Sequence, residues 1–462
     1  MQSPILCPLD GRYASTVKPM ALCMGEAALT RARVRAECIW LEVLSGLNLP
    51  GLAPLSAPEK QQLARLAELT EQDLQAIRAY EQTGRNGIKA TRHDVKAIEY
   101  FLKEKLAATP LKNRAEWLHF ALTSEDINSA AYAVLLADGL ERVLLPALEN
   151  LRRRLAALAR REAAAPLLAR THGQAAVPTT FGKEVRVFES RLSEQLNQLK
   201  KRQISFKFSG AVGNYNAHYA AFSQINWPRV SARVAAALNR GRKIKLYLSP
   251  LSTQIDNRDS YAELFDNLRR IHLILLGLCQ DFWRYISDGL LRQKAVAGEV
   301  GSSTMPQKIN PIHFENAEGN LQLSDALFTF FSAKLPLSRL QRDLSDSTVL
   351  RNMGVAFGYA LVAYTSLAEG LERVSFNRAL AKAQLAQHPE VLAEGIQTIL
   401  RAAGQEKPYE QLKALTRGRA FTQEDLQVFI ENLQVEPVIK NKLRALNVFN
   451  YTGLAAQRAR GK

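Results

Sequence analysis

Long stretches of apolar residues at spacings of three and four limit what this chain can fold into. One stretch runs from Thr123 to Ala163, and its apolar face consists of Leu140, Leu144, Leu148, Leu151, Leu155 and Leu158. Thr123, followed three places later by Asp126, predicts a capping box at its start, and Pro146 predicts a kink. Because a helix of this length exceeds the roughly 10–14 residues usual in globular proteins, it needs long partners.

Four further helices are expected. One begins near Gly182, one runs from Tyr261 towards Leu291, and two cover about 314–334 and 346–373. Alternating strand patterns are scarce, and the best one, at 243–249, predicts a hairpin arm or an extended insert. The sequence therefore predicts an all-α protein with a central bundle of long helices, whose apolar faces also pair between subunits.

The length of 462 residues favours more than one domain. We expect an N-terminal helical domain at 1–110, the central bundle with most of the active site at 111–365, and a C-terminal helical domain at 366–462. A hydrophobic content of 47% argues against disorder.

The formal net charge is +17, which suits nucleic acid, an acidic membrane or small anionic substrates. The densest basic clusters, at 151–161 and 239–245, lack interleaved aromatic residues, so solvated helix faces are favoured over a nucleic-acid site. No apolar run approaches membrane-spanning length. The N-terminus carries no signal-peptide pattern, and the four cysteines follow no paired or metal-like spacing, which indicates a cytoplasmic protein.

Polar, turn-rich stretches lie at several helix boundaries. They are 91–97, 119–128, 169–184, 252–260, 341–352 and "GSSTMPQKINP" at 301–311. In a bundle, boundaries far apart in sequence can meet at one end, and converging polar loops form a small-molecule site. A histidine such as His172 can exchange a proton near neutral pH, and a glycine-flanked loop with Lys308 can stabilise an oxyanion.

Taken singly, each of these residues also has a structural explanation. His172 could be a capping or core histidine, Ser302 and Ser303 could cap a helix, and Lys308 could be a solvated lysine. The histidines show no metal-ligand spacing, and no phosphate-loop, dinucleotide or nucleophile-elbow pattern occurs, so the sequence predicts neither a metal nor a cofactor.

The loop at 301–311 resembles the signature loop of the fumarase/aspartase superfamily. Together with other motifs, this loop gives the chain a resemblance to the adenylosuccinate lyase family over residues 8–450. The other motifs are "DGRY" (10–13), "HDVKAIEYFLKEK" (93–105), "TSEDIN" (123–128), "THGQ" (171–174), "GAVGNYNAH" (210–218), "TQI" (253–255) and "RDLSDSTVLRN" (342–352). The resemblance implies a three-domain helical subunit in a homotetramer, with each active site built from three subunits. It also implies anti β-elimination of fumarate from adenylosuccinate, giving AMP, and from succinylaminoimidazole-carboxamide ribotide.

The resemblance also implies roles for residues. Ser302 is the expected base and His172 the expected acid that protonates the departing nitrogen. The succinyl group is expected to bind Thr123, Ser124, Gln254, Ser303 and Asn310, and the phosphate to bind Arg12, Tyr13, Arg342, Ser347 and Arg351. Further substrate contacts are expected at Arg92, His93, Asp94, Lys308, Ile309, Asn316, Thr348, Val349 and Leu350. Gln307 and Arg92 depart from the family's usual residues, which leaves their contacts open.

Two alternatives stay open at this point. Argininosuccinate lyase and fumarase share the loop and the chemistry, although the paired arginines of 341–352 favour a nucleotide substrate. A basic helical protein that binds nucleic acid could retain the fold without activity, and its affinity would fall steeply with salt.

Overall fold

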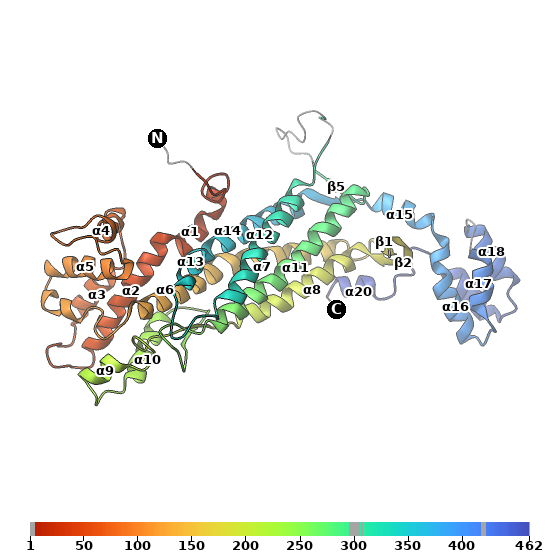
Figure 1. Cartoon of the computed structure of the whole chain (residues 1–462). Coiled ribbons are helices and arrows are strands. Elements are labelled where there is room, and N and C mark those ends of the chain that lie inside the picture. The colour runs from red at the N-terminus through yellow and green to blue at the C-terminus, as the bar shows by residue number, and fades with distance from the viewer. Residues whose placement is uncertain (1–4, 295–304, 306–307, 417–421, 462) are drawn as a thin grey trace. The chain divides into compact units, whose positions relative to one another are not determined.

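The computed structural model describes residues 5–294, 305, 308–416 and 422–461. Contacts divide the chain into two compact units. The first unit consists of residues 1–148, 195–273 and 319–365, and the second of residues 149–194, 274–318 and 366–462. Five helices (Figure 1) have part of their length in each unit: α7 (Leu145–Arg161), α8 (Phe181–Lys200), α11 (Asp259–Ser287), α12 (Ile312–Lys334) and α14 (Met353–Arg373).

The other elements each lie within one unit. The first unit holds α1 (Ala14–Met24), α2 (Glu26–Ser45), α3 (Ala57–Arg65), α4 (Glu71–Gln82), α5 (Asp94–Ala107), η1 (Lys112–Trp117), α6 (Ser124–Gly139), η2 (Leu140–Leu144), β3 (Ile204–Phe206), α9 (Asn216–Ala221), α10 (Trp227–Leu238), β4 (Leu246–Leu248) and α13 (Ser345–Arg351). The second holds β1 (Pro166–Thr171), β2 (Gln174–Thr180), β5 (Leu291–Gln293), β6 (Val374–Phe376), α15 (Arg378–Ala386), η3 (Pro389–Leu392), α16 (Ala393–Ala402), α17 (Pro408–Thr416), α18 (Gln423–Asn432), α19 (Pro437–Ala445) and α20 (Ala455–Ala459).

The all-α class predicted from the sequence is confirmed, since the strands of the described residues are short and pair only two at a time. The helix expected from Gly182 begins one residue earlier, at Phe181. The helix expected from Tyr261 covers 259–287 and ends before Leu291, which lies in β5 instead.

The stretch from Thr123 to Ala163 is not one α-helix with a kink at Pro146. A π-helical turn, η2, separates α6 from α7, and the N–H of Leu145 donates to the carbonyl of Leu140. Pro146 has no N–H with which to continue the usual ladder, so the wider turn lies directly before it.

The helix expected at 346–373 is also interrupted. It consists of the short α13 and the long α14, which are separated by Asn352. The side-chain amide of Asn352 donates to the carbonyl of Thr348 at 2.9 Å, a local bond that competes with the helical ladder.

Two short pairings correct the strand predictions. Residues 246–248 form β4, which pairs with β3 in parallel, so this segment is extended but is no hairpin arm. The hairpin lies elsewhere: β1 and β2 pair antiparallel across 166–180, a segment in which the sequence indicated only polar turns.

Aromatic rings fill the core of the first unit where three of the long helices meet. Phe265 of α11 stacks on Phe328 of α12 with 5.4 Å between ring centroids. Phe328 in turn meets the edge of Phe357 of α14 at 5.6 Å. All three rings are buried, so α11, α12 and α14 pack around one apolar centre in this unit.

A buried polar group joins the same three helices. The ring nitrogens of His272 lie 2.7 Å from Oδ1 of Asp325 and 2.6 Å from the hydroxyl of Tyr364. His272 is fully buried, and each of its ring nitrogens has a polar partner.

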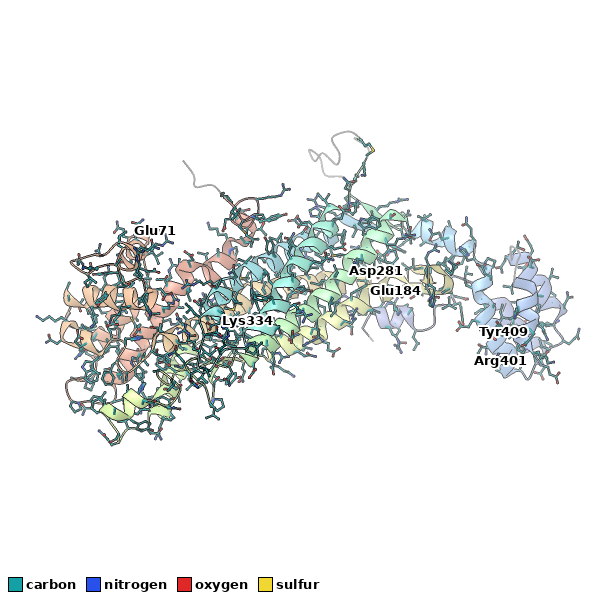
Figure 2. The ribbon with its side chains drawn as sticks, in the orientation of Figure 1. Glu71, Glu184, Asp281, Lys334, Arg401 and Tyr409 are labelled. Carbon is teal, nitrogen blue, oxygen red and sulfur yellow. The ribbon has the colours of Figure 1, made fainter. Side chains whose placement is uncertain are left out.

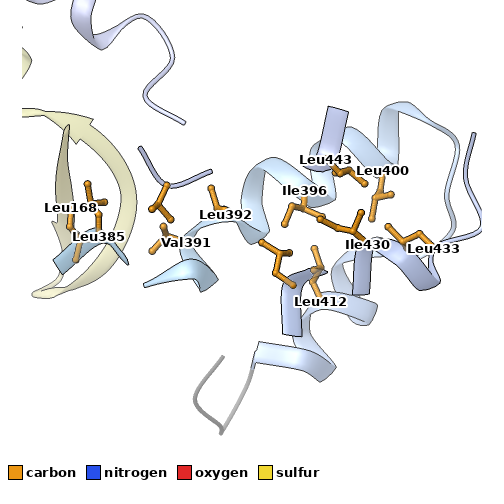
Figure 3. Packing of buried hydrophobic residues seen from close by; sticks show 12 residues of the cluster. Leu168, Leu385, Val391, Leu392, Ile396, Leu400, Leu412, Ile430, Leu433 and Leu443 are labelled. Carbon is orange, nitrogen blue, oxygen red and sulfur yellow. The ribbon is translucent and has the colours of Figure 1, made fainter. Parts of the chain in front are cut away.

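In the second unit, a separate apolar cluster extends from the hairpin into the C-terminal helices (Figure 3). Leu168 of β1 and Leu385 of α15 lie at one end, and Ile396, Leu400 and Ile430 lie at the other. This cluster packs α15 against the hairpin that carries His172. In the described part of the chain, no helix is long and apolar enough to cross a membrane.

Candidate active site

His172 lies at the tip of the β1–β2 hairpin, in the second unit. Thr171 pairs with Gln174, so His172 and Gly173 are the two turn residues, with φ angles of 53° and 75°. Positive φ at both positions gives the turn that fits the twist of the flanking strands. The His172 side chain is exposed and has no hydrogen-bond partner within the described residues. Its imidazole can therefore meet a ligand from outside its own hairpin.

The signature loop is described only at its end. Ser302 and Ser303, the expected base and one succinyl ligand, lie outside the described residues, as does Gln307. Lys308 and Ile309 are exposed, and the side-chain amide of Gln293 donates to the carbonyl of Ile309 at 2.8 Å. The last two predicted ligands of this segment, Asn310 and Asn316 of α12, are partly buried.

In the first unit, His93 begins α5 and reaches α6. Its Nδ1 accepts the backbone N–H of Lys96 at 3.3 Å, which makes His93 the cap of the helix. Its Nε2 lies 3.4 Å from the hydroxyl of Ser124. Two predicted ligands from separate helix starts are thus adjacent, with an imidazole and a hydroxyl available to one substrate group.

Asp94 is shared by two arginines. Its Oδ2 lies 2.7 Å from Nη2 of Arg33 and 2.8 Å from Nη2 of Arg351, and its Oδ1 accepts the backbone N–H of Val95. Burial alone would raise the pKa of Asp94, but the two guanidinium groups hold it below its usual value. One carboxylate against two guanidinium groups leaves one positive charge, which suits an anionic ligand.

Thr123 begins α6, and the expected capping box is present. The carboxylate of Asp126 accepts the N–H of Thr123 at 2.9 Å. The same carboxylate accepts the N–H of Ser209 at 2.8 Å and lies 2.7 Å from the ammonium of Lys207. Lys207 and Asp126 are both fully buried. The start of α6 is therefore fixed to the 207–210 segment by charge-assisted hydrogen bonds.

Gln254 and Arg342 are in direct contact. Oε1 of Gln254 accepts from Nη1 of Arg342 at 3.1 Å, and its Nε2 donates to the carbonyl of Ala211 at 3.1 Å. The other terminal nitrogen of Arg342 lies 3.3 Å from Oε2 of Glu125. A predicted succinyl ligand and a predicted phosphate ligand are thus placed side by side.

Glu125 connects this pair to a deeper layer of charge. Its Oε1 accepts from Nη2 of Arg258 at 3.0 Å, and Nη1 of Arg258 lies 2.6 Å from Asp346. Burial raises the pKa of Glu125, although Arg258 and Arg342 oppose that shift. Burial lowers the pKa of Arg258, but Glu125 and Asp346 more than reverse this, so it stays a cation.

The remaining predicted phosphate ligands and substrate contacts of this unit come from three segments. Tyr13 is the residue before α1 and is partly buried, whereas Arg12 and Arg92 are exposed. On α13, Ser347 is partly buried and Thr348 is exposed, but the side chains of Val349 and Leu350 lie in the core. Val349 and Leu350 could therefore meet a ligand only through their backbone.

Two acidic residues lie near each other in the second unit without having been singled out from the sequence. Figure 2 labels them as Glu184 of α8 and Asp281 of α11. Burial raises the pKa of Asp281, and the negative charge of Glu184 raises it further. Glu184 accepts hydrogen bonds from Thr179 at 2.8 Å and Lys183 at 3.1 Å, so these groups occupy one of its oxygens. In the described ranges, no group of three or more His, Cys, Asp or Glu side chains could hold a metal ion.

Sequence reasoning missed the buried charges beneath the site. They are Arg33, Glu125, Lys207, Arg258 and Asp346. Glu125, Arg258 and Asp346 do lie in the polar stretches at helix boundaries, which was a usable signal. Arg33 lies within α2 in the stretch RARVR (31–35), where it does not differ from its neighbouring arginines, and it gave none.

Comparison with known proteins identifies the family. A profile described as "Lyase" matches residues 29–322, and one described as "Adenylosuccinate lyase C-terminal" matches residues 338–452. The chain is similar to the adenylosuccinate lyase of Legionella pneumophila (strain Corby), with 43% identity over 98% of this chain and 97% of that protein. The adenylosuccinate lyase of Escherichia coli (strain K12) is also 43% identical, over 97% of this chain and 96% of that protein.

The fold also matches that of a solved structure. The crystal structure of a fumarate lyase from Mesorhizobium sp. BNC1 matches with a TM-score of 0.74 and 18% identity, over 96% of this chain and 97% of that one. This likeness confirms the fumarase/aspartase-like fold expected from the signature loop. The relatives match almost from end to end and at more than two-fifths identity, so this chain belongs to the adenylosuccinate lyase family.

Proposed function

We propose that this chain is an adenylosuccinate lyase, which releases fumarate by β-elimination. Its substrates are adenylosuccinate, which gives AMP, and succinylaminoimidazole-carboxamide ribotide. The full-length similarity to proteins that bear this name supports the proposal. The observation that carries it is the surplus of positive charge around Asp94, beside the hydroxyl of Ser124 and the imidazole of His93. A phosphorylated dicarboxylate needs such a combination of cations and neutral donors.

The reaction breaks one carbon–nitrogen bond. A base removes a proton from the carbon next to a carboxylate, the electron pair forms the carbon–carbon double bond of fumarate, and the purine nitrogen leaves with a proton from an acid. Because the proton is very weakly acidic, the extra charge on the carboxylate must be stabilised by donors already in place. The amide of Gln254 and the hydroxyls of Thr123 and Ser124 are such donors.

In this proposal Ser302 of one subunit acts as the base, and His172 of another subunit acts as the acid. A hydroxyl is a weak base unless its alkoxide is stabilised, and the ammonium of Lys308 and the backbone N–H groups of the signature loop stabilise it. Ser303, Asn310 and Asn316 hold the succinyl group, with Ile309 beside them. His172 suits its role because its imidazole is exposed at a hairpin turn.

The phosphate binds at the first unit. Arg342 and Arg351 present guanidinium groups, whose planar fork matches a phosphate, and Ser347 and Thr348 add hydroxyls. Arg12, Tyr13 and Arg92 complete the pocket, with backbone groups of Val349 and Leu350. His93 and Asp94 orient the cations and the neighbouring hydroxyl of Ser124.

The active form is a homotetramer in which three subunits contribute to each site. Several large apolar side chains on the long helices are exposed, among them Leu273, Trp283, Leu323 and Phe330. Exposed apolar faces of this kind are suited to burial between subunits.

We also propose a division into three domains, at 1–110, 111–365 and 366–462. The protein is cytoplasmic in this proposal, and it acts without a cofactor and without binding nucleic acid or a membrane.

Fumarate formation tests the proposal. Purified protein should release fumarate from adenylosuccinate and from succinylaminoimidazole-carboxamide ribotide, but not from argininosuccinate or malate. If the protein releases fumarate only from argininosuccinate or only from malate, that compound would replace the proposed substrates. Retention of oligonucleotides that weakens steeply with salt, without any fumarate, would favour a nucleic-acid-binding protein.

A further inference from the structure

Arg258 occupies an unusual position directly before α11. Its side chain is almost completely buried, and its backbone has a φ of 59°, in the left-handed region that residues with a Cβ rarely adopt. Its N–H donates to Oδ2 of Asp256 at 2.8 Å, which helps hold this conformation. A strained backbone that carries a buried cation needs a reason beyond ordinary helix termination.

The guanidinium of Arg258 bridges two carboxylates from distant parts of the chain. Nη2 donates to Oε1 of Glu125 at 3.0 Å, and Nη1 lies 2.6 Å from Oδ2 of Asp346. Glu125 directly follows Ser124 at the start of α6, and Asp346 directly precedes Ser347 in α13. One side chain therefore ties together two segments that carry proposed substrate ligands.

The bridge also controls the charge available to a ligand. Oε2 of Glu125 faces Arg342 at 3.3 Å, so Glu125 is shared between Arg258 and Arg342. Without Arg258, the charge of Glu125 would act on Arg342 alone, and Asp346 would be a buried carboxylate with no cation beside it. Arg342 would then offer less attraction to a phosphate.

Stability alone does not account for this arrangement. Buried ion pairs lose much of their attraction to desolvation, and apolar side chains of similar size often stabilise a core as well or better. Here four charged side chains form a chain from Arg342 through Glu125 and Arg258 to Asp346, and its outer end is a proposed phosphate ligand.

We infer that Arg258 is a positioning residue for the phosphate-binding end of the site. It sets the orientation of Arg342 through Glu125 and the position of α13 through Asp346, without touching the substrate. This role rests on the proposed function, because the ligand is the phosphate of a nucleotide. It predicts that loss of the bridge weakens recognition of the phosphate and not of the nucleoside.

Binding of AMP and adenosine, measured by calorimetry, tests the role without depending on turnover. In Arg258→Lys the charge remains, but one ammonium cannot bridge both carboxylates with the same geometry. We expect AMP affinity to fall about tenfold or more, while adenosine affinity changes less than about twofold. Asp346→Asn breaks the bridge from its other end, leaves Arg258 paired with Glu125, and should lower AMP affinity in the same selective way.

A matched control separates positioning from general stability. Arg242 is a second buried arginine of the first unit; it pairs with Asp138, and neither residue is a proposed ligand. Arg242→Lys should lower the melting temperature but leave the ratio of AMP to adenosine affinity unchanged. If Arg258→Lys does not fold, Asp346→Asn carries the test.

The outcomes distinguish this inference from the proposed function. A wild-type protein that binds AMP no better than adenosine would overturn both. If the wild type prefers AMP and Arg258→Lys keeps that preference, only the role of Arg258 would be overturned. Where Arg258→Lys does not fold, an intact preference in Asp346→Asn would have the same meaning. Equal selective loss in Arg242→Lys would also overturn it, because any buried ion pair would then have the same effect.

Discussion

Arg351 donates from Nη2 to Oδ2 of Asp94 at 2.8 Å, and Asp94 in turn faces Arg33 at 2.7 Å. The carboxylate thus holds an exposed arginine beside a buried one, and the three side chains together carry one excess positive charge. Because Arg351 ends α13 and Asp94 begins α5, this contact places two predicted ligands together that are 257 residues apart.

Asp94→Asn removes the charge that both arginines share. Arg33 and Arg351 should then repel each other, and Arg351 should lose its fixed position, so we expect KM for adenylosuccinate to rise about tenfold. The matched control is Glu104→Gln, because Glu104 lies on the same helix as Asp94 and forms an ion pair with Arg85. Steady-state kinetics measure both variants, and an equal KM in Asp94→Asn and the wild type would remove Asp94 from the site.

Arg342→Lys keeps the charge but loses the planar fork that contacts Gln254 and Glu125. Binding of both ribotide substrates should weaken by about 1.5–3 kcal/mol, the value of a hydrogen bond to a charged group. The loss should largely vanish with substrate analogues that lack the phosphate. If Arg342→Lys and the wild type show the same difference in affinity between phosphorylated and unphosphorylated compounds, the phosphate binds elsewhere.

A buried histidine should make stability depend on pH. His218 lies among Trp40, Tyr215 and Trp227, and within the described residues neither ring nitrogen has a hydrogen-bond partner. Burial lowers the pKa of His218 to about 4; the nearby charges of Asp126 and Lys207 act in opposite directions.

His218 binds a proton near pH 6.5 in the unfolded state and only near pH 4 in the folded state. Its contribution to the free energy of unfolding is therefore complete above pH 6.5 and is lost as the pH falls towards 4. The loss should approach about 3 kcal/mol. His218→Phe cannot titrate, so denaturant midpoints of this variant should fall less between pH 7 and pH 4.5 than those of the wild type. If the denaturant midpoints of the variant and the wild type fall equally over this pH range, other groups cause the acid sensitivity.

The long helices could be predicted because their signal is local and repeated. The predicted apolar face repeats at every turn, and the structure buries all six of its leucines in α7 and the turn before it: Leu140, Leu144, Leu148, Leu151, Leu155 and Leu158. The π-turn before Pro146 and the break at Asn352 could not be predicted in detail, because single hydrogen bonds decide where the helical ladder shifts.

The candidate site was predictable only where its residues belong to a motif. The Arg258–Glu125 bridge spans 133 residues, and no spacing along the sequence reveals such a pair. The hairpin of His172 was missed for another reason. Its two turn residues include a histidine at positive φ, whereas the usual signals are asparagine or aspartate followed by glycine.

Mixing two inactive variants tests the central claim, that His172 and Ser302 of different subunits perform one elimination. His172→Ala and Ser302→Ala should each form tetramers without turnover, because neither side chain belongs to an apolar helical stripe. After subunit exchange at equal amounts, about a quarter of the sites should contain both intact residues. Fumarate release from adenylosuccinate should therefore return to about a quarter of the wild-type rate. Near-normal activity of either variant alone, or no recovery after verified exchange, would contradict the account.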